Sequence, residues 1–135
     1  MGKTTTSNKS QSSRIRLVLR TGSIVFGLSA VALIATPDVF NNLLGLATGP
    51  DLEWAMRMIG ITLVALAGNM LSVSSRGSDE SVTFSARVML ISAFALGVLT
   101  LLVPVPLTWF TIVYAVVGFA FSAAYALVLF VKPGR

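Results

Sequence analysis

The sequence contains neither cysteine nor histidine among its 135 residues. Disulfide bonds, thiol nucleophiles and imidazole acid–base chemistry are therefore excluded, and zinc or haem would lack their usual ligands. Asp and Glu together number only five, and none lies within the apolar core of a long run. A proton-coupled exchanger would thus lack the membrane carboxylate that such proteins use. We assign no catalytic residue, no cofactor and no metal ion to this chain.

Apolar residues are abundant instead. They make up 55% of the chain, charged residues make up 11%, and the mean hydropathy is +0.86, which is typical of a membrane protein. Four runs reach the length of about 20 residues that one membrane crossing needs: residues 17–36, 53–73, 82–103 and 107–131. The fold class predicted is an all-α integral membrane protein, a bundle of four transmembrane helices.

The polar segments divide the chain into a tail and a membrane domain. Residues 1–13 are rich in Ser and Thr and lack apolar periodicity, so we expect a disordered cytoplasmic tail before a four-span domain at residues 14–135. Between the first two spans, Asp38 is expected to cap a short helix with Val39 and Phe40 on one side and Asn41 and Asn42 on another. We interpret it as an amphipathic connector at the outer interface; a lid over the bundle is the alternative.

Basic residues are distributed asymmetrically between the two sides of a four-span protein. The connections at residues 38–51 and 104–106 contain no Lys or Arg. The other side carries Lys3, Lys9, Arg14, Arg16, Arg20, Arg76, Lys132 and Arg135. The positive-inside rule then predicts a cell (plasma or inner) membrane protein with both termini cytoplasmic, and Trp54 and Trp109 at the outer interface. The expected partners are the lipid bilayer and its anionic headgroups, not nucleic acid.

Two groups of polar residues in the spans are candidates for function. Arg57 lies near the outer end of the second span with Glu53 at i−4, which predicts an outer-mouth pair that either anchors the helix or lines a vestibule. Arg20, Asn69 and Arg87 all lie toward the cytoplasmic ends of their spans. They are candidate anion or headgroup contacts at one level of the membrane. In the alternative, each arginine extends separately to the membrane surface, and Asn69 forms a hydrogen bond to a neighbouring helix.

Small residues recur at i, i+4 spacing, which lets helix backbones approach closely in a membrane. The rows are Ser23 and Gly27, Gly60, Val64 and Gly68, Ala93 and Gly97, and Gly118, Ser122 and Ala126. We expect most of them to serve packing within the chain. The row in the fourth span is also a candidate dimer face.

Several positions in the first half of the chain resemble a known family. Arg20, Pro37, the Leu-Leu-Gly-Leu run of residues 43–46 and the Arg-Met-Ile-Gly run of residues 57–60 are similar to the pattern of small DoxX-like four-helix membrane proteins. The resemblance implies a compact four-helix bundle and, for some members, a place in membrane-associated redox assemblies. This chain has no cysteine to act in such redox chemistry itself.

These observations favour a non-catalytic accessory or scaffold subunit that contacts another membrane protein. One alternative is an oligomeric carrier of a small molecule or lipid, binding an anionic group through Arg57 or through Arg20 and Arg87. Another is a membrane enzyme that depends on a partner's cofactor.

The predicted orientation can be tested with cysteines, because the chain has none of its own. We expect a membrane-impermeant thiol reagent applied to intact cells to label Thr48→Cys and to leave Ser10→Cys unlabelled until the membrane is opened. Labelling of Ser10→Cys alone from outside would reverse the topology.

Overall fold

The computed structural model describes residues 2–131, and their side chains from residue 6 onward. Within this range the regular structure is entirely helical: α1 (Gly2–Ala35), α2 (Pro37–Leu43), α3 (Pro50–Arg76), α4 (Asp79–Leu101) and α5 (Trp109–Phe130). The four long helices have the length and composition to cross a membrane, and α2 is the short helix expected between the first two. The predicted fold class is confirmed, and the chain is a small multi-pass membrane protein.

The start of α1 differs from the prediction of a disordered tail, because residues 2–13 are helical. At 1.5 Å per residue the 34-residue helix is about 51 Å long, against about 30 Å for a hydrocarbon core. The side-chain amide of Gln11 donates to the carbonyl oxygens of Val128 (3.2 Å) and Leu129 (3.0 Å) at the end of α5. The membrane span supplies the helix nucleus, so extension into the polar segment costs little. Met1 and Lys132–Arg135, part of the predicted tail and charge pattern, lie outside the described residues.

The α2 helix corrects two predictions. It begins at Pro37 with Thr36 at the N-cap position, so Asp38 lies in the first turn and does not cap the helix. Pro37 has the backbone angle that the first helical position requires. Asn41 is fully buried, not turned away with the polar face, and Val39 is half exposed. The reason is the packing of Phe40, whose ring lies edge-on to Phe110 at a centroid distance of 5.4 Å and so sets the rotation of α2.

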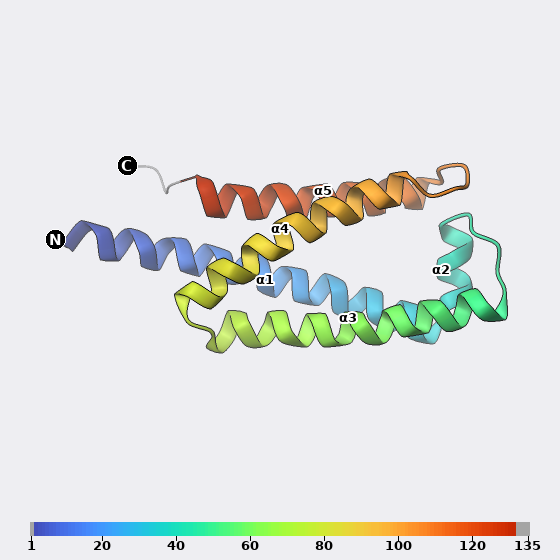
Figure 1. Ribbon diagram of the computed structural model, residues 1–135, viewed down its shortest axis with the longest axis horizontal. Helices are drawn as coiled ribbons and strands as arrows, with labels where there is room; N and C mark the ends of the chain where they lie inside the picture. Colours follow the sequence, from blue (N-terminus) through green and yellow to red (C-terminus); the bar gives the residue numbers. More distant parts are fainter. Residues whose placement is uncertain (1, 132–135) are drawn as a thin grey trace.

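The four long helices are arranged as two pairs. Figure 1 shows α1 lying along α3 and α4 lying along α5, with α2 at one end of the bundle. Contacts between the pairs run mainly through α1, and α3 touches α4 only slightly. We call the end that carries α2 and the α4–α5 connection the α2 end. The opposite end, with the start of α1 and the α3–α4 connection, is the basic end.

Small residues allow α1 and α3 to approach closely. A Cβ atom added at Gly60 would lie 3.2 Å from the carbonyl oxygen of Ala30, so only glycine fits here without movement. Nearer the basic end, the Ser23 hydroxyl donates a 2.8 Å hydrogen bond to the carbonyl oxygen of Ala67. Both positions belong to the small-residue rows of the sequence, which confirms packing within the chain for these residues.

The α4–α5 pair is built in the same way. A Cβ atom at Gly118 would lie 3.2 Å from the Ala93 carbonyl oxygen and from the backbone of Gly97. The Ser122 hydroxyl donates to the carbonyl oxygen of Leu90 at 3.1 Å. The candidate dimer face on the fourth span is therefore wrong for Gly118 and Ser122, because both are used against α4.

The main core lies in the half of the bundle near the basic end. There, buried side chains from all four long helices meet: Ile15, Leu19, Met70, Val82, Ala86, Met89, Tyr125 and Val128. In the other half, toward the α2 end, the two helix pairs separate. This difference between the halves leaves a space between the helix pairs near the α2 end.

Gly118 provides a test of the α4–α5 contact. We expect Gly118→Leu to lower the free energy of unfolding by about 1–3 kcal/mol, because the added side chain meets backbone atoms that cannot move aside. Thermal or denaturant unfolding in detergent, followed by circular dichroism, measures the loss. Gly68→Leu is the matched control: nothing lies within 4 Å of its Cβ position, so helix propensity should leave stability unchanged or raise it by about 0.5–1 kcal/mol. Equal effects at both glycines would contradict the close approach.

Candidate functional site

An apolar cavity separates the two helix pairs in the half near the α2 end. Its volume is about 600 Å³, and its lining is almost wholly apolar. Every helix contributes to the wall, with residues that include Val25, Leu33, Phe40, Met56, Leu63, Leu96, Tyr114, Val117 and Phe121. Ligand pockets in proteins occupy about 300–1,000 Å³, so this cavity is large enough for a small apolar molecule.

A few polar groups lie in the wall of the apolar cavity. The Tyr114 hydroxyl donates to the Ser29 hydroxyl at 3.4 Å, which is a long and weak bond. Thr111 faces the same space, but its hydroxyl is already 2.9 Å from that of Thr108. The Ser29–Tyr114 pair is thus the place where a carbonyl or hydroxyl group of a ligand could form a better hydrogen bond.

The α2 helix and the α4–α5 connection bound the cavity at its end. Phe40 contacts both Phe110 and Tyr114 edge-on, and the Thr108 hydroxyl donates to the Leu43 carbonyl oxygen at 2.6 Å. Beside this contact lies Asn41, whose side-chain nitrogen and oxygen are buried without a hydrogen-bond partner among the described residues. A buried, unbonded amide costs about 1–3 kcal/mol. The packing of Phe40, which sets the rotation of α2, brings Asn41 into this position.

The predicted pair of Glu53 and Arg57 is present, with 3.9 Å between the Arg57 Nη2 and Glu53 Oε2 atoms. Both side chains are accessible, 29% for Glu53 and 52% for Arg57, so the pair contributes about 0.3–0.5 kcal/mol at most. Trp54, between them in the sequence, is also exposed. Neither charged residue is among those that line the apolar cavity. This geometry fits an interfacial anchor better than the wall of a vestibule.

The structure does not bring Arg20, Asn69 and Arg87 into one site. Arg87 lines a groove between α1, α4 and α5, whereas Asn69 lines a separate hollow between α3 and α4. Arg20 is exposed on α1 and lines neither of these spaces. Asn69 is also exposed, so it does not face the bundle interior as polar residues in spans commonly do.

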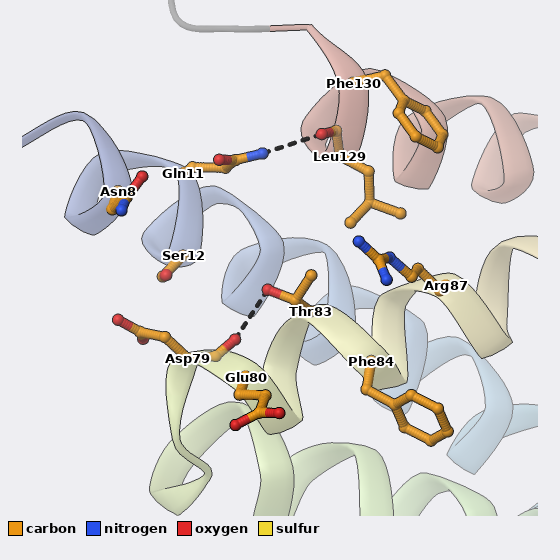
Figure 2. Close-up of a pocket in the computed structure, with 10 residues that line it drawn as sticks. All are labelled: Asn8, Gln11, Ser12, Asp79, Glu80, Thr83, Phe84, Arg87, Leu129 and Phe130. Atoms are coloured by element: carbon orange, nitrogen blue, oxygen red, sulfur yellow. Dashed lines mark hydrogen bonds between the residues drawn. The ribbon is translucent and has the colours of Figure 1, made fainter. Parts of the chain in front are cut away.

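The groove at the basic end, which we call the Arg87 groove, has a volume of about 540 Å³ (Figure 2). Its lining is half polar and carries charges of both signs. The residues that line it are Asn8, Gln11, Ser12, Asp79, Glu80, Thr83, Phe84, Arg87, Leu129 and Phe130. Figure 2 shows the Arg87 side chain extending into the groove beside Leu129 and toward Thr83. Of the three predicted contacts, only Arg87 lines this groove.

Arg16 fixes the α3–α4 connection next to this groove. Its guanidinium donates to the carbonyl oxygens of Ser74 (3.0 Å) and Gly77 (2.7 Å), and it forms an ion pair with Asp79 at 3.2 Å. These carbonyls end α3, where the backbone has no partner of its own and the helix dipole favours a cation. From the sequence, Arg16 could be assigned only to the cluster of basic residues. Its partners are 58 or more residues away, so no spacing in the sequence predicts the contact.

Four apolar helices, an apolar cavity at one end and a charged groove at the other define a small multi-pass membrane protein with two candidate ligand sites. Comparison with protein-family models, with curated proteins and with solved structures finds no match to the chain.

Replacing Arg16 should reveal which of its contacts matters for stability. We expect Arg16→Ala to cost about 1.5–3 kcal/mol of unfolding free energy, since it leaves two helix-end carbonyls without their charged donor. Asp79→Asn should cost less than about 1 kcal/mol, because that carboxylate is 61% exposed. Arg14→Ala, an exposed position on the same helix, is the control for loss of a cation. A larger loss in Asp79→Asn than in Arg16→Ala would refute the dominance of the carbonyl contacts.

Proposed function

We propose that this protein binds the acyl chain of a lipid, or a similarly apolar molecule, between its two helix pairs. The observation that carries the proposal is the apolar cavity, about 600 Å³ in volume and lined by all five helices. Side chains that face each other across a space of this size are too far apart for dispersion contacts. A flexible apolar chain restores those contacts without desolvating any polar group.

The lining supports a chain with a polar end group. Apolar side chains form nearly all of the wall, and the Ser29–Tyr114 pair provides one site for a hydrogen bond. A lipid ester or a fatty alcohol has this combination of a long apolar part and one polar group. This proposal corresponds to the lipid carrier expected as an alternative from the sequence. The binding element is the apolar cavity and not a cluster of arginines.

The orientation proposed for the protein has both termini in the cytoplasm, in a plasma or inner membrane. It is supported by the absence of Lys and Arg from the connections at the α2 end and by their concentration at the basic end. In this orientation the apolar cavity lies in the outer half of the bilayer. The ligand would then come from the outer leaflet.

A second candidate is the accessory subunit favoured by the sequence. It is supported by the separation of the helix pairs, because apolar faces that do not contact each other could receive side chains of a partner's helix. The resemblance to DoxX-like proteins, some of which belong to membrane assemblies, agrees with this candidate and stays a prediction. A lipid and a partner helix would compete for one space, so one set of variants can separate them.

Two neighbouring valines on α5 form the test. Val117 lines the apolar cavity, whereas Val116 is 59% exposed on the outside of the helix. We expect Val117→Trp to fill the cavity and remove about one tightly held lipid per chain in native mass spectrometry from mild detergent. Val116→Trp adds the same ring to the outer surface and should retain it.

The outcomes separate the two candidates. If a partner protein, cross-linked in the membrane, is lost in Val117→Trp while no lipid is retained by the unmodified chain, the accessory role replaces lipid binding. Equal retention of lipid in both variants would reject the cavity as the site. Val25→Trp, on the opposite wall, serves as a second filling variant if Val117→Trp does not fold.

A further inference from the structure

Arg87 is an exposed cation within the apolar α4 helix. It lies eight residues after the start of α4 at Asp79, or about 12 Å along the helix axis. No described residue forms an ion pair with it. An arginine within an apolar span is costly unless its guanidinium reaches water or an anion. The Arg87 groove supplies that access, and Figure 2 shows the side chain extending along it.

The carboxylates of the groove lie nearer the basic end than Arg87. Asp79 already forms an ion pair with Arg16, and Glu80 forms none among the described residues. Figure 2 shows the Glu80 carboxylate directed away from the Arg87 guanidinium, so the two do not neutralise each other. Glu80 is exposed, and its side chain is free to turn toward a cation in the groove. Asp79 and Glu80 therefore form an acidic mouth of the groove near the basic end, and the cation Arg87 lies farther along α4.

We propose that the Arg87 groove binds the headgroup of a zwitterionic phospholipid, with its phosphate on Arg87 and its ammonium group toward Glu80 and Asp79. In such a lipid the phosphate lies next to the glycerol and the ammonium group lies farther toward water. The order of charges in the groove is complementary to this order. A planar guanidinium can also donate two parallel hydrogen bonds to phosphate oxygens.

The wall of the groove favours a lipid over a free phosphate ion. Phe84 and Phe130 are 68% and 73% exposed and provide apolar surface beside the charged residues, where acyl chains would run. A free phosphate ion has no group to contact them and would meet two carboxylates on its way in. The acidic mouth likewise disfavours an anionic headgroup. This site is separate from the apolar cavity and does not depend on the function proposed for it.

The test uses the full chain, purified in detergent and freed of lipid, titrated in native mass spectrometry with phosphatidylethanolamine or phosphatidylglycerol. We expect the unmodified chain to prefer phosphatidylethanolamine. Arg87→Gln should weaken its binding at least about tenfold, because it removes the charged donor to the phosphate. Glu80→Gln should reduce the preference over phosphatidylglycerol. Arg76→Gln, exposed at the same end but outside the groove, is the control and should bind like the unmodified chain.

Three results would overturn the proposal: equal affinity in Arg87→Gln and the unmodified chain, an unchanged lipid preference in Glu80→Gln, or displacement of the lipid by millimolar inorganic phosphate. If Arg87→Gln fails to fold, the Glu80→Gln preference decides. The titration is repeated in Val117→Trp, which removes any lipid held in the apolar cavity. Loss of binding there with Arg87 intact would assign the lipid to the cavity and not to the groove.

Discussion

Close approach of helix backbones at small residues is the constraint on which the rest of this structure depends. In a bilayer the lipid is as apolar as the side chains, so burial of hydrophobic surface gives helices little reason to associate. Dispersion contacts and interhelical hydrogen bonds must therefore hold the helices together. Gly60 and Ser23 provide them between α1 and α3, and Gly118 and Ser122 provide them between α4 and α5.

The two closely packed helix pairs form a bundle whose two halves differ. Near the basic end, buried side chains from all four helices meet, and Arg16 ties α1 to the α3–α4 connection. Near the α2 end the pairs separate around the apolar cavity, which α2 and the α4–α5 connection bound through the contact of Phe40 with α5. Both candidate sites follow from this division.

The candidate functional residues show which contacts can be predicted from spacing in the sequence and which cannot. Glu53 and Arg57 are four residues apart on one helix, so their contact could be predicted from spacing alone, and it is present. Arg20, Asn69 and Arg87 come from three helices, and their meeting depended on helix rotations that spacing does not specify. The structure places them on different surfaces. The residues that line the apolar cavity look in the sequence like any other apolar residues of a span.

The sequence by itself determined the four helices long and apolar enough to cross a membrane, the presence of a short helix between the first two, and the concentration of basic residues at one end. Length, apolar composition and charge are properties of each segment. Tertiary structure alone decided that the helices form two pairs, that Asn41 is buried, and that the apolar cavity and the Arg87 groove exist. The physical reason lies in the solvent. In water an apolar stripe shows which face of a helix is buried, whereas in lipid both faces are apolar and the rotation of each helix is set only by contact with its neighbours.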